Sequence, residues 1–166
     1  MYSDLKSVIV CPPKSNMSKA DINEWHYDGP LNQEKLDSNF KEFIDIVESF
    51  GSEIITLKTS ENLFDSVFPH DPSLITDHGA IILNMGKKLR MLETDFHKKL
   101  YKEINIPILG SIQSPGKVEG GDCLWIDNKT LVVGKGFRTN KKGIEQLNEL
   151  LNTHGIEVIG YDLPYY

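Results

Sequence analysis

The stretch Asp71-Pro-Ser-Leu-Ile-Thr-Asp-His-Gly-Ala-Ile-Ile-Leu-Asn84 has a counterpart later in the chain, Asp122-Cys-Leu-Trp-Ile-Asp-Asn-Lys-Thr-Leu-Val-Val-Gly-Lys135. Each stretch opens with Asp, continues as a short apolar strand, turns, and ends as a second apolar strand. An arginine, a helical stretch and a third apolar strand then follow in the same order in both cases. The sequence therefore repeats a ββαβ unit.

The spacing of matching residues gives the period of this repeat. The opening Asp residues are 51 positions apart, Arg90 and Arg138 are 48 apart, and the third strands, 106–110 and 156–160, are 50 apart. A period near 50 residues predicts a repeat architecture in which no unit buries its apolar face alone. The alternative is chance similarity between two alternating segments. We expect one mixed α/β domain over residues 1–166, with units at about 1–60, 61–111 and 112–166.

The remaining pattern predicts the other elements. The expected strands are short and rich in Val, Ile and Leu, and they cover residues 7–11, 53–57, 73–76, 80–84, 106–109, 123–126, 130–134 and 156–160. Helices are expected at about 32–50, 90–103 and 140–154, with Thr139 as N-cap of the third and Gly51 and Gly155 as helix stops. Their apolar faces are expected to be Leu36, Phe40, Phe43, Val47 and Phe50; then Leu92, Phe96 and Leu100; then Ile144, Leu147 and Leu151.

Composition excludes several classes of protein. The chain has 18 basic and 24 acidic residues, a net charge of −6, which argues against a duplex-binding protein and against nucleic acid as a partner. No apolar run approaches the roughly 18 residues of a membrane span, and the first residues lack a signal-peptide stretch. Cys11 and Cys123 are far apart, so we expect two free thiols in a reducing cytoplasm.

Two acidic segments are the sharpest local signals of a site. In Val118-Glu-Gly-Gly-Asp122, two glycines behind a carboxylate let the backbone turn tightly and approach a ligand closely. Glu119 would then point into a cavity, where it could orient a histidine or bind a cation; the alternative is a β-turn with solvated carboxylates. Asp65 and Asp71 form a second acidic cluster, although an Asp before Pro also starts ordinary turns.

Arg90 and Arg138 occupy equivalent places in the two units, where the second strand passes into a helix. Arginine there can hold a carboxylate with two hydrogen bonds, and the alternative is a surface arginine beside a helix. We expect Asp71, Glu119, Arg90 and Arg138 to face one concave surface. Acidic groups for a cationic head and arginines for an anionic end fit a free amino acid that bears a guanidinium. The histidines lack metal-ligand spacing, and Cys123 on a strand is expected to be an inert thiol.

The sequence resembles a known protein family. Four segments carry the resemblance: Asp65-Ser-Val-Phe-Pro-His-Asp-Pro72, Gly86-Lys-Lys-Leu-Arg90, Val118-Glu-Gly-Gly-Asp122 and Gly136-Phe-Arg-Thr-Asn140. They resemble the guanidine-modifying superfamily, in particular the dimethylarginine dimethylaminohydrolases and related amidinotransferases. The resemblance implies a pentein fold, an α/β propeller of five ββαβ units around a pseudo-fivefold axis, of which this chain carries about three.

The resemblance also implies a chemistry. A thiolate attacks the central carbon of a guanidinium, and water or an amine then resolves the covalent amidino-thioether. Glu119 matches the acidic partner of the catalytic histidine, Asp71 and Asp65 match carboxylates on the substrate side, and Arg90 and Arg138 match residues that hold its amino-acid end. No cofactor or metal is implied.

Two expected catalytic residues have no counterpart in these 166 residues. The family's histidine lies in the fourth unit and its cysteine in the fifth, whereas here no His follows His154 and no Cys follows Cys123. The ending Asp162-Leu-Pro-Tyr-Tyr166, directly after a strand, also suggests a shortened chain. We therefore expect an inactive N-terminal part that forms a homo-oligomer or pairs with a completing C-terminal chain. The alternatives are a non-catalytic pentein-type binding module and an α/β repeat scaffold without a small-molecule site.

Overall fold

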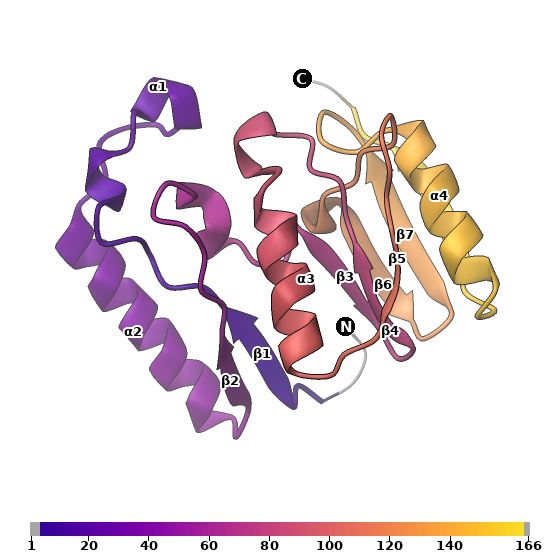
Figure 1. Cartoon of the computed structure of the whole chain (residues 1–166), viewed down its shortest axis with the longest axis horizontal. Coiled ribbons are helices and arrows are strands. Elements are labelled where there is room, and N and C mark those ends of the chain that lie inside the picture. Colours follow the sequence, from indigo (N-terminus) through magenta and orange to yellow (C-terminus); the bar gives the residue numbers. More distant parts are fainter. Residues whose placement is uncertain (1–3, 165–166) are drawn as a thin grey trace. The chain divides into compact units, whose positions relative to one another are not determined.

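A computed structural model describes residues 4–164, and its contacts gather into two compact units, residues 4–69 and 70–164 (Figure 1). We describe each unit by itself. The expectation drawn from the final two tyrosines lies outside the described residues. Of the residues that the structure describes, no helix is long and apolar enough to cross a membrane.

The unit of residues 4–69 contains a two-stranded parallel sheet and its helices. Strand β1 (Ser7–Val10) pairs with β2 (Glu53–Thr56), and α1 (Ile22–Trp25) and α2 (Gln33–Ser49) lie between them in the sequence. The side chain of Asn32 caps α2 by accepting from the Lys35 amide at 2.9 Å. The chain leaves α2 through Gly51, whose φ of 77° lies in the left-handed region, as the sequence predicts.

The apolar face of α2 is less buried than expected. Val47 is buried, but Phe43 is 49% exposed and Phe50 is 80% exposed. Two strands, spaced by about 4.8 Å, offer too narrow a surface to cover the whole apolar stripe of a 17-residue helix. The prediction that Phe43 and Phe50 are core residues is therefore wrong in this structure.

The first repeat of the unit at 70–164 has the predicted ββαβ order. Strand β3 (Ser73–Thr76) pairs antiparallel with β4 (Gly79–Ile82), which pairs parallel with β5 (Ile108–Ser111). Helix α3 (Glu93–Glu103) connects β4 to β5. The crossover through a helix is what two neighbouring parallel strands require.

The second repeat has the same order and the same strand directions. Strand β6 (Cys123–Asp127) pairs antiparallel with β7 (Thr130–Lys135), which pairs parallel with β8 (Glu157–Asp162). Helix α4 (Lys141–Asn152) connects β7 to β8. The predicted mixed α/β repeat is confirmed for these two ββαβ repeats. Their arrangement around a ring axis, together with the N-terminal repeat at about 1–60, stays a prediction.

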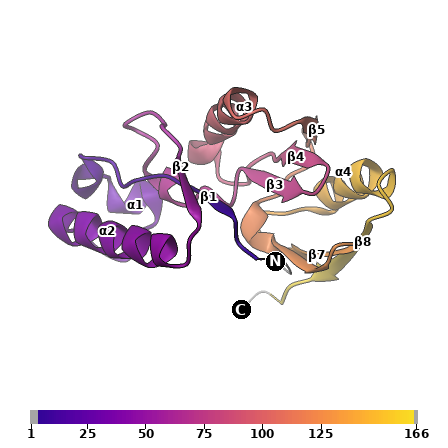
Figure 2. The ribbon, with the colours of Figure 1, turned by 90° about the horizontal axis from the view of Figure 1, so that it is seen from below.

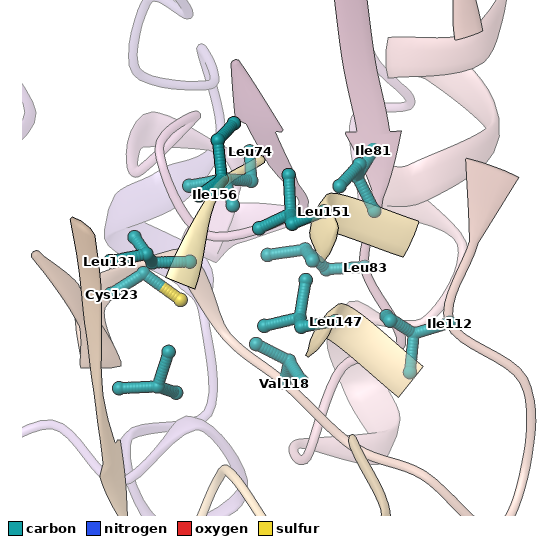
Figure 3. Packing of buried hydrophobic residues seen from close by; sticks show 11 residues of the cluster. Leu74, Ile81, Leu83, Ile112, Val118, Cys123, Leu131, Leu147, Leu151 and Ile156 are labelled. Carbon is teal, nitrogen blue, oxygen red and sulfur yellow. The ribbon is translucent and has the colours of Figure 1, made fainter. Parts of the chain in front are cut away.

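Helix α4 lies between the two three-stranded sheets of this unit (Figure 2). Figure 3 shows Leu147 and Leu151 of α4 between Leu131 on one side and Ile81 on the other. The core cluster consists of Leu74, Ile81, Leu83, Ile112, Val118, Cys123, Leu131, Val133, Leu147, Leu151 and Ile156. One helix thus supplies the apolar layer for two sheets.

Both ends of α4 have identifiable signals, one of them different from the prediction. The N-cap is Asn140, whose side chain accepts from the Gly143 amide at 2.9 Å, so the expectation for Thr139 is wrong by one position. Thr139 is instead buried and hydrogen-bonded to polar groups. The expected stop is confirmed, since Gly155 follows the helix with a φ of 71°.

Helix α3 buries Leu100 as predicted, together with a polar face that the sequence pattern did not predict. It begins at Glu93, so Leu92 precedes its first turn and is 62% exposed. Its His97 and Tyr101 are buried and both lie within hydrogen-bond distance of Ser73 Oγ, at 3.0 and 2.5 Å. Burial, assisted by the charge of Arg90, lowers the pKa of His97 to about 4.

Candidate active site

Glu119 precedes β6 in the sequence, and its carboxylate is almost fully buried. Its side chain is 8% exposed, and Oε1 accepts from the backbone amides of Gly86 and Lys87 at 2.9 and 3.0 Å. These amides follow β4, so a loop of the first repeat holds a carboxylate of the second. A Cβ at Gly86 would lie 2.7 Å from Arg138 Cα, which is why glycine is needed there.

Arg138 covers this carboxylate from the solvent side. Its Nη1 lies 3.1 and 3.2 Å from the two carboxylate oxygens of Glu119, and its side chain is 42% exposed. A half-exposed guanidinium therefore pairs with a buried carboxylate. Water competes with such a pairing and makes it weaker than a fully enclosed one.

Asp71 adjoins Glu119 through the two glycines of the acidic segment. Its backbone carbonyl accepts from Gly120 N at 2.9 Å, and its Oδ1 accepts from Gly121 N at 2.9 Å. A Cβ at Gly120 would lie 2.1 Å from the carbonyl oxygen of His70, so only glycine fits. The structure thus brings Asp71 next to the segment that carries Glu119.

Arg90 is enclosed by two carboxylates. It is 3% exposed; its Nη1 lies 2.6 Å from Asp71 Oδ2, while Nε and Nη2 bind Glu93 at 2.8–3.2 Å. Burial alone would lower the pKa of Arg90, but the bonds and charges of Glu93 and Asp71 raise it above the ordinary value. Its expected contact with a substrate stays a prediction.

Two further residues hold the site and were missed from the sequence. Thr139 donates to Asp122 Oδ2 at 2.6 Å and accepts from the Glu119 amide at 3.1 Å. Burial, helped by the nearby charges of Glu119 and Asp71, raises the pKa of Asp122. The second is Glu93, whose spacing of three residues from Arg90 was a usable signal.

Cys123 has the character expected of an inert thiol. It is 8% exposed, and burial together with the charges of Asp122 and Asp71 raises its pKa to about 12. At neutral pH the sulfur therefore stays protonated and is a poor nucleophile.

Asp65 belongs to the other compact unit. It lies on the 3₁₀ helix Phe64–Val67, is 6% exposed, and accepts a hydrogen bond from Tyr27 OH at 2.8 Å. The aromatic rings of Trp25 and Phe64 pack edge to face beside it, with centroids 5.2 Å apart. Its role toward a ligand stays a prediction.

The two carboxylates of the candidate site are both paired with guanidinium groups. Within residues 4–164, no three His, Cys, Asp or Glu side chains gather closely enough to hold a metal ion. Glu119 and Asp71 each bind a guanidinium of the chain itself, Arg138 and Arg90 respectively. Charge-assisted hydrogen bonds between a carboxylate and a guanidinium are among the stronger ones in proteins.

Comparison with known proteins supplies independent findings. The family model described as arginine deiminase matches residues 31–163. An uncharacterized protein of Caenorhabditis elegans is 28% identical over 98% of this chain and 57% of its own length. The N(G),N(G)-dimethylarginine dimethylaminohydrolase of Pseudomonas aeruginosa is 31% identical over 69% of this chain and 44% of its own length. This chain thus spans about half the length of these curated relatives.

A solved structure of the Pseudomonas aeruginosa enzyme is similar in fold. It is a cysteine-to-serine variant complexed with citrulline, and it matches with a TM-score of 0.84 and 25% identity. The match covers 98% of this chain and 62% of that one. The similarity therefore extends over both compact units of the chain, and more than a third of the relative lies outside it.

Proposed function

This chain belongs to the arginine deiminase family, within the guanidino-modifying pentein superfamily, and from this membership we propose that it is the substrate-holding part of a cysteine-dependent guanidino hydrolase. It would act in the cytoplasm on arginine-like compounds. Glu119 and Asp71 would hold the guanidinium and Arg138 its amino-acid end, while the buried Arg90 would keep Asp71 in position.

The pairing of Glu119 with Arg138 is the observation that carries the proposal. The carboxylate is buried and fixed by two backbone amides, while its guanidinium partner is half exposed and held by a single nitrogen. A substrate guanidinium can replace Arg138 there without leaving the carboxylate unpaired. The displaced Arg138 is then free to pair with the substrate's carboxylate end.

The proposed reaction needs a thiolate and a proton-transferring histidine in addition to these residues. The thiolate forms an S–C bond to the guanidinium carbon, the C–N bond to the leaving amine breaks, and the amine takes a proton. Water then hydrolyses the amidino-thioether to a ureido product and returns the thiol. The contribution of this chain is to fix the electrophilic carbon and to pair the substrate's charge away from water.

Binding of arginine by calorimetric titration tests the substrate-holding role. We expect Glu119→Gln to weaken binding about tenfold or more, because a hydrogen bond to a charged group contributes about 1.5–3 kcal/mol. Glu145→Gln, a surface carboxylate on α4, is the matched control and should bind as wild type. Equal binding by wild type and Glu119→Gln would contradict the proposal.

Two ligands separate the roles of Arg138. Arg138→Gln should bind methylguanidine more tightly than wild type, because the internal competitor for Glu119 is gone. The same variant should bind arginine less tightly, because the partner for its carboxylate is gone. A change of the same sign for both ligands would argue against exchange at Glu119.

Turnover tests the reactive part of the proposal. We expect no citrulline release from arginine or methylated arginines by the 166-residue chain alone, since loss of a catalytic nucleophile typically removes several orders of magnitude in rate. Citrulline formation that persists after treatment with a thiol alkylator would overturn the thiol mechanism.

A further inference from the structure

A buried polar cluster surrounds a thiol in the unit of residues 4–69. Cys11 directly follows β1 and is 1% exposed. Its sulfur lies 3.4 Å from Ser66 Oγ, 3.8 Å from Thr59 Oγ1 and 3.8 Å from Lys14 Nζ. Thr59 follows β2 and Ser66 lies on a 3₁₀ helix, so the fold brings together groups that are far apart in the sequence.

Lys14 is an unusual member of this cluster, because lysine is almost never fully buried unless it is paired. It is 6% exposed, and its Nζ donates to the Thr59 carbonyl at 3.4 Å and to the Cys11 sulfur at 3.8 Å. No carboxylate of residues 4–164 binds this nitrogen. Burying a lysine nitrogen without a carboxylate is costly, and the reactive group that it faces here is a thiol.

The same unit offers this thiol no partner for a disulfide. Cys11 is the only cysteine in residues 4–69, and Cys123 is buried in the core of the unit at 70–164. Both cysteines are free. A thiol that is oxidised to a sulfenic acid can condense with another thiol to a disulfide or with a nitrogen to a sulfenamide. Of the contacts described for the Cys11 sulfur, only that of Lys14 supplies a nitrogen.

We propose that hydrogen peroxide joins Cys11 and Lys14 in a reversible cross-link, a sulfenamide. Peroxide oxidises the thiol to a sulfenic acid and is itself reduced to water. The Lys14 nitrogen then forms an S–N bond, the S–O bond breaks, and the hydroxyl leaves as water with one proton from the nitrogen. Two molecules of a small thiol reverse the reaction: they return the Cys11 thiol and the Lys14 amine, and they become a disulfide.

The surroundings of the sulfur support each step. The hydroxyl groups of Thr59 and Ser66, 2.8 Å apart, both contact the sulfur and can hydrogen-bond to the oxygen of a sulfenic acid. Burial keeps larger thiols away, whereas peroxide is close to water in size and needs only a local opening. The flexible four-carbon side chain of Lys14 lets its nitrogen approach the sulfur without moving β1. The proposal therefore depends on this cluster alone and not on the proposed function.

The test treats the folded 166-residue chain with hydrogen peroxide, blocks the remaining thiols with iodoacetamide and digests the chain with trypsin. In the untreated chain trypsin cuts after Lys14 and gives the segments 7–14 and 15–19. A linked Lys14 is no longer a trypsin site. We therefore expect most of both segments to be replaced by the uncut segment 7–19, with two hydrogen atoms fewer than its parent. Fragment spectra separate this product from oxidation of Met17, and dithiothreitol should restore the cut.

Variants assign the link to Lys14. Lys14→Arg keeps a positive charge and a trypsin site, but its guanidinium is a poor nucleophile, so it should form no link. Sulfenic acid at Cys11, measured by dimedone labelling, should then accumulate severalfold above wild type, and Lys14→Gln should show the same increase. Lys58→Gln, which changes an exposed lysine beside Thr59, and Cys123→Ser are the controls and should link as wild type. Circular dichroism checks that each variant is folded.

The wild-type chain in urea separates a site built by the fold from mere nearness in the sequence. Residues three apart also meet in an unfolded chain, so a link that forms as readily in urea would overturn the proposal. Three further results would do the same: cleavage after Lys14 that peroxide leaves unchanged, a link that retains an oxygen between sulfur and nitrogen, and a disulfide between Cys11 and Cys123 as the main product. These results come from the wild-type chain, so they decide the proposal even if a variant fails to fold.

Discussion

The two repeats of the unit at 70–164 pair a carboxylate with an arginine in the same way but enclose the pair differently. In the first, Arg90 is buried and held by both Asp71 and Glu93. In the second, Arg138 is half exposed and holds only Glu119 among the contacts described for it. The same sequence arrangement thus gives a fixed structural pair in one repeat and an exchangeable one in the other. The difference lies in Glu93, because α4 of the second repeat has no carboxylate at the equivalent position.

The largest expected effect on stability comes from removing the charge of Glu93, which binds the buried Arg90. Glu93→Gln should lower the free energy of unfolding by about 3–5 kcal/mol, because it removes a charged partner from the buried Arg90 guanidinium. Urea unfolding followed by circular dichroism measures it. A loss below about 1 kcal/mol would show that the enclosure of Arg90 contributes no more than a surface pair.

A second comparison uses the repeat-equivalent leucines. Leu74→Ala should cost about 3–5 kcal/mol, since it leaves a cavity beneath α4, whereas Leu124→Ala should stay within about 0.5 kcal/mol. The two variants remove the same atoms from equivalent strand positions, so each is the control for the other. Similar losses in both would mean that Leu124 is covered in the isolated chain.

His97 on α3 should make the stability of the chain depend on pH. The pKa of His97 is about 4 in the folded chain and about 6.5 when unfolded, so the unfolded state binds the extra proton between these values. Its contribution to stability is complete above pH 6.5 and is lost as pH falls toward 4, amounting to about 2–3 kcal/mol between pH 7 and 4.5. His97→Gln should flatten this part of the profile, and an unchanged slope would assign the acid sensitivity to the carboxylates.

The smallest effect is expected at the exchangeable pair. Arg138→Gln should change the free energy of unfolding by no more than about 1 kcal/mol, because the side chain is 42% exposed and water replaces it at Glu119. The same unfolding measurement as for Glu93→Gln checks it. A loss comparable to that of Glu93→Gln would remove the distinction between the two repeats.

Much of this fold could be predicted from the sequence because it depends on local pattern. All the predicted strands are present, with each end within two residues of the prediction, because each is a short apolar run and most are bounded by turn-forming residues. Periodicity identifies the apolar face of a helix but not what lies against it. That is why Phe43 and Phe50 were wrongly assigned to the core.

The residues of the candidate site could be predicted from the sequence, but their burial could not. The spacing of motifs identified Asp71, Glu119, Arg90 and Arg138, and the structure places these four in one unit. The burial of Arg90 depends on a contact with Glu93, which in sequence looks like an ordinary surface pair three residues apart. Desolvation is set by tertiary packing, so sequence spacing cannot separate an enclosed pair from a solvated one.

The position of α4 between two sheets sets an order of events during synthesis. Leu147 is made 66 residues after Ile81, which it covers in the finished core. At about 5–20 residues per second, the strands β3 and β4 therefore wait roughly 3 to 13 seconds with one apolar face open. During that interval the uncovered apolar face and strand edges can pair with other chains.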